Sequence, residues 1–238
     1  TLQTREQHIR REKATSNICT AQVLLAIISG MYALFHGPNN LKNIAKRIHS
    51  HTKELADKIS NLGHEIVTND NSFFDTVVIK LSNMTIDSLR DKALEHNFNL
   101  MYHDNGLIGI SLDEKTNDSE VEAITKLFDI KSDSKNSYNI FKPNRTGNIL
   151  THPIFHSINS ETEMLRYINK LEKRDLSLNY SMIPLGSCTM KLNATVEMIP
   201  ISWPEFNSIH PFAPLSQAKG YKKIINELEE MLYKVTGF

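Results

Sequence analysis

The sequence predicts a mixed α/β protein whose best-defined part is a small α+β domain. Phe73–Leu81 is rich in aromatic and β-branched residues, which is typical of a strand. Asp104-Asn105-Gly106 separates two further apolar runs and indicates a hairpin. Helical patterns at Thr85–His96 and Asp118–Phe128 flank these strands. We therefore expect a sheet with helices on one face.

Two helices are predicted ahead of this domain. Ala21–Phe35 is apolar almost all round, so we expect a buried helix that ends at His36-Gly37-Pro38. Leu41–Leu62 carries apolar residues at helical spacing and is predicted to be a long amphipathic helix that ends at Gly63.

The composition changes after the small domain. Lys131–Asn148 is polar, which favours a linker. Ser160 and Glu163 have the spacing of a capping box, and the helix that they open should run to about Arg174. The proline-containing stretch Asp175–Pro214 has no clear period, so we expect it to be extended and loop-rich. Gln217–Val235 is predicted to be a last amphipathic helix.

The overall composition excludes some classes of function. Lys and Arg together number 27, as do Asp and Glu, and a balanced charge does not favour nucleic-acid or anionic-membrane binding. No apolar run is long enough to cross a bilayer. Cys19 and Cys188 lie far apart and show neither metal-site spacing nor a disulfide framework, so a reducing compartment is expected.

The segment Met182–Asn193 is the strongest candidate for chemistry. Gly186 permits unusual backbone conformations, and the three residues after it can offer hydroxyl, thiol and backbone N–H groups to a ligand. Such a loop faces an anion or a cofactor, or it is a well-packed structural turn; the residues alone leave both open.

The histidines and cysteines are weaker candidates. His49 and His51 are two residues apart and should point to different faces of a helix, and Pro153 interrupts the spacing of His152 and His156. We therefore expect no metal site. A Cys188–His210 pair is chemically conceivable, although nothing in the sequence places the two together. Cys19 at a helix start is either a thiol of lowered pKa or a small buried hydrophobe.

Three blocks of sequence resemble one known family. Met182–Pro211 reads MIPLGSCTMKLNATVEMIPISWPEFNSIHP, Thr4–Gln22 reads TREQHIRREKATSNICTAQ, and Ser160–Ile168 reads SETEMLRYI. Together they are similar to the P-protein of the glycine cleavage system, the pyridoxal-phosphate-dependent glycine decarboxylase. The blocks occur in the family's order and the resemblance spans nearly the whole chain.

The resemblance implies a domain organisation. The family looks like two related halves in tandem, each with a fold-type-I pyridoxal-phosphate architecture, and only the second half keeps a working cofactor site. We accordingly expect an internal fragment that spans the junction of the halves. Its parts would be a helix-rich end of the first large domain (1–36), the small α+β domain (37–130), a linker (131–150), and the arm and start of the catalytic half (151–238).

The resemblance also implies site residues. Pocket-lining candidates for the cofactor are Ser187, Cys188, Thr189, Lys191 and Asn193. The family's Schiff-base lysine follows a histidine, and this chain has no His-Lys dipeptide, so no catalytic residue is expected within it. The family more often has a Tyr-His pair where this chain has Ile158-Asn159, which is a departure next to the arm helix.

The implied reaction is that of glycine dehydrogenase (aminomethyl-transferring), an oxidoreductase of glycine catabolism. Glycine would lose carbon dioxide, and the aminomethyl group would pass to the lipoyl arm of the H-protein. We expect a homodimer in the bacterial cytoplasm, or in the mitochondrial matrix of a eukaryote, without nucleic-acid or membrane partners. The alternative is a free-standing amino-acid-binding regulatory module, because Phe73–Phe128 also resembles small sensor domains. That alternative leaves Met182–Pro211 without an explanation.

Overall fold

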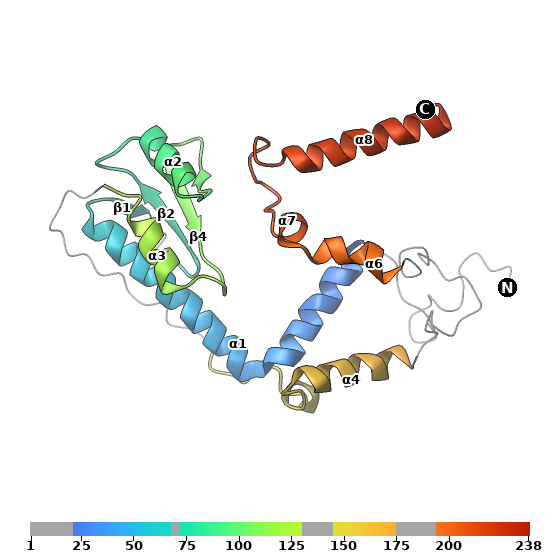
Figure 1. Ribbon diagram of the computed structural model, residues 1–238. Helices are drawn as coiled ribbons and strands as arrows, with labels where there is room; N and C mark the ends of the chain where they lie inside the picture. Colours follow the sequence, from blue (N-terminus) through green and yellow to red (C-terminus); the bar gives the residue numbers. More distant parts are fainter. Residues whose placement is uncertain (1–20, 68–71, 130–144, 175–193) are drawn as a thin grey trace. The chain divides into compact units, whose positions relative to one another are not determined.

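The computed structural model describes residues 21–67, 72–129, 145–174 and 194–238 (Figure 1). The chain divides into two compact units, residues 1–177 and 178–238. Helices and one four-stranded sheet make up the described part, which confirms the predicted mixed fold class.

Among the residues that the structure describes, no helix is both long enough and apolar enough to cross a membrane.

Helix α1 (Ala21–Asn61) is a long helix with a break near its middle (Figure 1). Gly37 leaves the helical conformation, with φ 60° and ψ 178°, and Pro38 follows it. The predicted stop at His36-Gly37-Pro38 is therefore a break at which the helix restarts at once. Proline suits such a restart, because its fixed φ fits the first turn of a helix and its missing N–H is not needed there.

The first arm of α1, up to His36, is not buried as the sequence predicted. Leu24 and Leu25 are 64% and 67% exposed, whereas Leu34 near the break is 7% exposed. The arm is apolar, but the described part of the chain covers only its end. The expectation of a buried helix was wrong because an apolar pattern does not say where the covering surface comes from.

The sheet is antiparallel throughout, in the order β1-β2-β4-β3. Its strands are β1 (Glu65–Val67), β2 (Thr76–Lys80), β3 (Met101–Tyr102) and β4 (Leu107–Ser111). The strand predicted within 73–81 and the hairpin around Asn105-Gly106 are confirmed. Gly106 has φ 81° and donates its N–H to the His103 carbonyl at 3.0 Å, which closes the turn. The three-residue strand β1 was not predicted.

Helices α2 (Ile86–Glu95) and α3 (Asp118–Thr125) complete this domain, and both begin at predicted positions. The Thr85 hydroxyl caps α2, and Asn117 forms a capping box with Glu120 at the start of α3.

A single apolar core lies on one face of the sheet. The register places Val77 opposite Ile110 and Ile79 opposite Ile108, so these four side chains share a face. All three helices contribute to the same cluster, which confirms the expectation of helices on one face. Their buried members are Leu55, Ala56 and Ile59 of α1, Leu89 and Ala93 of α2, and Val121 and Ile124 of α3.

Two elements follow in the same unit, η3 (Pro153–His156) and α4 (Glu161–Glu172). The Ser160 hydroxyl accepts from the Glu163 N–H at 3.3 Å, which confirms the predicted start of α4. In return, the Asn159 N–H donates to the Glu163 carboxylate at 2.8 Å, one residue earlier than in a standard capping box.

The described part of the second unit contains α6 (Thr195–Met198), η4 (Ile199–Ser202), α7 (Pro204–Asn207) and α8 (Lys219–Thr236). The last of these confirms the predicted final helix, which ends at Gly237 with φ 76°. Within the stretch 175–214 that was expected to be loop-rich, residues 195–207 form a run of short helical turns, and residues 175–193 lie outside the described residues. Pro200 and Pro204 sit in the first turns of η4 and α7, where proline is well tolerated.

Candidate functional site

The residues predicted to line a cofactor pocket lie outside the described residues. They are Ser187, Cys188, Thr189, Lys191 and Asn193, within the undescribed range 175–193. Cys19, in the range 1–20, also lies outside. The first described residue after the predicted loop is Ala194, the N-cap residue of α6. The pocket therefore stays a prediction, and the structure bears only on the segment from Ala194 onward.

An aromatic cluster lies shortly after the predicted loop. The rings of Trp203 and Phe206 are 6.2 Å apart, and Phe206 meets Tyr221 edge-on at 6.1 Å. The Tyr221 hydroxyl donates to the Phe206 carbonyl, so α7 is tied to the first turn of α8. Edge-to-face aromatic pairs add to stability beyond the area that they bury. This cluster gives 203–221 a defined local structure, and sequence reasoning did not find it.

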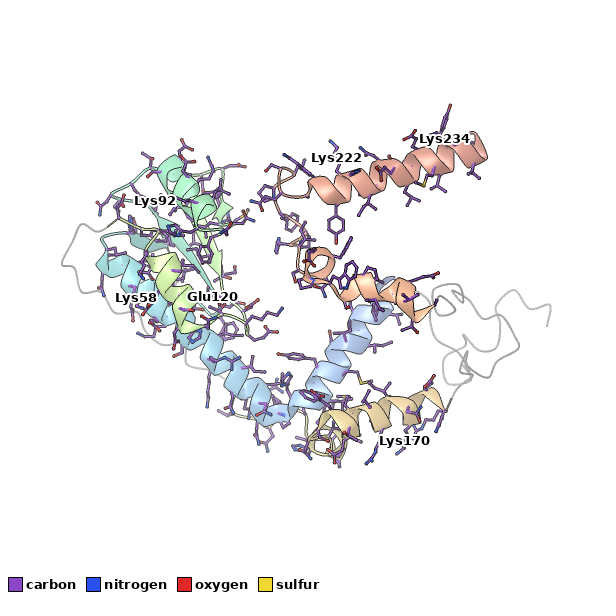
Figure 2. The ribbon with its side chains drawn as sticks, viewed as in Figure 1. Lys58, Lys92, Glu120, Lys170, Lys222 and Lys234 are labelled. Atoms are coloured by element: carbon purple, nitrogen blue, oxygen red, sulfur yellow. The ribbon has the colours of Figure 1, made fainter. Side chains whose placement is uncertain are left out.

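The described part of the second unit has no core of its own, because no residue within 194–238 is buried. Figure 2 shows the side chains of α8, with Lys222 and Lys234 labelled near its two ends. Its apolar side chains are largely exposed; Leu228 and Met231, for example, are 54% and 61% exposed. Exposed apolar side chains that recur along one helix are typical of a surface that binds other protein.

Histidines of the first unit have structural partners. His49 Nδ1 lies 3.0 Å from the Phe74 carbonyl oxygen, and its ring stacks on Phe74. His51 Nε2 lies 3.3 Å from an Asp118 carboxylate oxygen, so it links α1 to α3. The two histidines thus have different partners, as their spacing predicted. Over the described ranges, no group of three or more His, Cys, Asp or Glu could hold a metal ion.

The remaining candidate histidines contact nearby backbone groups. His152 Nδ1 accepts from the Ile154 N–H at 3.2 Å, and His156 Nε2 lies 3.1 Å from the Leu150 carbonyl oxygen. His210 Nδ1 accepts from the Phe212 N–H at 3.1 Å. Because Cys188 is outside the described residues, the Cys188–His210 pair also stays a prediction.

One polar cluster near the break in α1 was not predicted. The Arg47 guanidinium donates to the Glu114 carbonyl at 2.9 Å, which ties α1 to the loop before α3. Burial raises the pKa of Tyr32, the charge of Glu114 raises it further, and the charge of Arg47 lowers it. The Tyr32 phenol therefore stays neutral at physiological pH. The cluster joins elements that are far apart in sequence, which is why spacing alone could not reveal it.

Together, the fold and the sequence define a mixed α+β protein. A compact sheet domain is followed along the chain by helix α4 and by the exposed amphipathic helix α8. A family model described as "Glycine cleavage system P-protein" matches residues 1–128, just over half of the chain. The chain belongs to this family.

Curated relatives match the whole chain. A "Glycine dehydrogenase (decarboxylating)" of Thermosynechococcus vestitus is 51% identical over 239 residues. Proteins of the same name from Rhizobium leguminosarum and Vibrio parahaemolyticus are 52% and 50% identical. Each alignment covers 100% of this chain and 25% or 26% of the relative. The chain thus spans about a quarter of the length of these relatives.

Among solved structures, a "NIFS-LIKE PROTEIN" matches this chain with a TM-score of 0.33 and 20% sequence identity. The match covers 37% of this chain and 28% of the chain of that protein. A similarity of this size does not establish a shared architecture.

Proposed function

We propose that this chain contributes to a glycine dehydrogenase (decarboxylating), the enzyme that releases carbon dioxide from glycine in the glycine cleavage system. The alignment of the complete chain with relatives of that name, at 51% identity for the Thermosynechococcus vestitus protein, carries the proposal. It includes both the sheet domain and the segment around the predicted loop. A free-standing regulatory module would account for the sheet domain alone.

The predicted loop suits the phosphate group of pyridoxal 5'-phosphate. Ser187 and Thr189 offer hydroxyl donors, Lys191 a positive charge and Asn193 an amide, and such groups bind an anionic phosphate well. Cys188 would line the same wall. When bound, the cofactor supplies an electron sink for the loss of the glycine carboxylate. The loop residues would hold the cofactor and orient it, and no lysine of this chain would attach to it.

The exposed surface of the second unit fits a role within a larger protein. Leu228 and Met231 of α8 are more than half exposed, so this helix gains stability only where other protein covers it. The aminomethyl group would pass to the lipoyl arm of the H-protein, and the enzyme would be a homodimer in the bacterial cytoplasm.

A chimeric enzyme tests this proposal. These 238 residues would replace the matching residues of the Thermosynechococcus vestitus relative. We expect the chimera to release carbon dioxide from glycine in the presence of a lipoylated carrier protein, and to show the absorbance of bound pyridoxal phosphate. Single changes Ser187→Ala, Thr189→Ala and Lys191→Ala should each weaken cofactor binding by about tenfold, the usual effect of removing one contact to a charged group.

The matched control is Ser208→Ala, which removes an exposed hydroxyl that bonds only to its neighbour Asn207 among the described contacts. It should leave cofactor affinity and turnover unchanged. A chimera that folds and binds the cofactor without decarboxylating glycine would contradict the proposed activity. Normal cofactor affinity in all three loop variants would contradict the pocket instead. Tight glycine binding by the isolated 238-residue chain would favour the regulatory-module alternative.

A further inference from the structure

A second, smaller buried region lies at the break in α1, away from the core of the sheet domain. Of the described apolar residues that are buried, Leu34 and Ile158 alone do not belong to the sheet-domain cluster. They are 7% and 6% exposed, and Gly37 and Pro38 are also buried. Helix η3, which ends two residues before Ile158, packs against α1. The segment 150–158 is therefore in contact with the break.

In this contact, the backbone of η3 approaches the backbone of α1 closely. A Cβ atom placed on Gly37 would lie 2.8 Å from the Phe155 carbonyl oxygen, closer than real Cβ atoms approach other groups. The conformation of Gly37, with φ 60° and ψ 178°, is also one that residues with a side chain rarely adopt. Glycine is thus required twice, for the break itself and for the approach of η3. Gly30 in the same helix has nothing within 4 Å of such an atom.

The segment that meets the break is compact through its own hydrogen bonds. The Ile154 N–H donates to His152 Nδ1, the Ser157 hydroxyl donates to the Ile154 carbonyl at 3.0 Å, and His156 Nε2 lies near the Leu150 carbonyl. A segment that is already ordered loses little conformational entropy when it docks. Local order and a close backbone contact together favour a specific site over loose packing.

We propose that residues 150–158 form a docking segment and that the break in α1 around Leu34, Gly37 and Pro38 is its binding surface. The contact joins one stretch that precedes the polar segment Lys131–Asn148 in the sequence to another that follows it. It anchors the start of α4 to α1 independently of that segment, and it holds the two arms of α1 in one relative direction. The inference is independent of the proposed enzymatic function.

Amide hydrogen exchange of the full 238-residue chain, measured peptide by peptide, tests the docking from the α1 side. Gly37→Ala should accelerate exchange in 150–158 by at least about tenfold, because the added methyl group and the strained backbone both oppose docking. Exchange in β2 and β4 should not change. Gly30→Ala is the matched control in the same helix, and it should leave 150–158 protected as in the unmodified chain.

The same measurement tests the contact from the other side. Ile158→Asp places a charge at a buried position without altering α1, and it should accelerate exchange around Leu34–Pro38 by a similar factor. Reciprocal release, with β2 and β4 unchanged as the internal reference for folding, supports the docking site. The proposal is overturned if Gly37→Ala leaves 150–158 protected, or if Ile158→Asp leaves the break protected while the sheet remains folded.

Discussion

The helices of the sheet domain and α8 all carry amphipathic patterns, yet of these two described regions only the sheet domain has a core. Leu55 in the second arm of α1 is 0% exposed, whereas Leu228 in α8 is 54% exposed. The second arm of α1 and helix α8 both present an apolar face. The difference shows that periodicity predicts the existence of such a face, while its burial depends on a second surface that periodicity does not reveal.

A pair of identical substitutions should give the largest difference between these regions. Leu55→Ala removes a fully buried side chain from the sheet-domain core, and we expect it to lower the free energy of unfolding by about 2–5 kcal/mol. Leu228→Ala should change the stability of the sheet domain by less than about 0.5 kcal/mol, because it creates no cavity in the core of that domain. Urea titrations followed by circular dichroism and by hydrogen exchange of β2 and β4 would measure both.

Equal losses from both substitutions would contradict the comparison, because they would mean that α8 has a packing partner as close as the one Leu55 has. The same two variants made in the chimeric enzyme would test whether α8 is covered there. There, a large loss from Leu228→Ala would show that the additional polypeptide covers α8.

Replacing two glycines by alanine should give smaller effects on stability, and these effects should have opposite signs. Gly106 has φ 81° in the hairpin, and the nearest atom to an added Cβ is 3.8 Å away, so Gly106→Ala is opposed by backbone strain alone. We expect a loss of about 1–2 kcal/mol in sheet-domain stability. Gly220 lies in the first turn of α8, with open space around it. Gly220→Ala should stabilise the helix by up to about 1 kcal/mol, because alanine has the higher helix propensity, and helicity should rise.

Circular dichroism at low temperature would measure the helicity change, and urea titration would measure the hairpin change. A stabilised hairpin in Gly106→Ala would contradict the positive φ that the turn requires. A loss of helicity in Gly220→Ala would contradict an open position at the start of α8.

Local rules explain which parts of the fold could be predicted from sequence. Asn105-Gly106 specifies its turn, Ser160 specifies the start of α4, and β-branched residues mark β2, because each signal lies within a few residues of the structure that it produces. Strand β1 is three residues long and joins the sheet through β2, so its own sequence carries too little pattern to reveal it.

Contacts across long sequence separations were beyond prediction. Nothing local to Gly37 indicates that the Phe155 carbonyl approaches it, and nothing local to Arg47 indicates its bond to the Glu114 carbonyl. The predicted pocket residues, Ser187 to Asn193, rest on family resemblance and on the chemistry of their side chains. Their arrangement lies outside the described residues and stays a prediction that the loop variants test.

The last contrast concerns pH and centres on His64, which joins α1 to β1. It is 2% exposed, and its Nδ1 accepts from the Ser82 N–H at 3.2 Å. Burial lowers the pKa of His64, and the backbone and charge of Asp129 act in the opposite direction. Protonation would also replace the accepting Nδ1 with a second N–H that faces the Ser82 donor.

The sign of the pH effect is set by this lowered pKa. The unfolded chain takes up a proton near pH 6.5, whereas the folded chain takes it up only at lower pH. The contribution of His64 to stability is thus complete above about pH 6.5 and is lost as the pH falls from there through the folded pKa. At neutral pH this effect vanishes, so it is smaller than the effects of the leucine and glycine substitutions.

Urea titrations of the sheet domain between about pH 7.5 and pH 5, at intervals of roughly half a pH unit, would measure this loss. His64→Asn keeps an oxygen acceptor for Ser82 but cannot titrate, so its stability should fall less steeply over the same range. If both proteins lose stability in parallel, the acid sensitivity arises from other groups, and folding does not lower the pKa of His64.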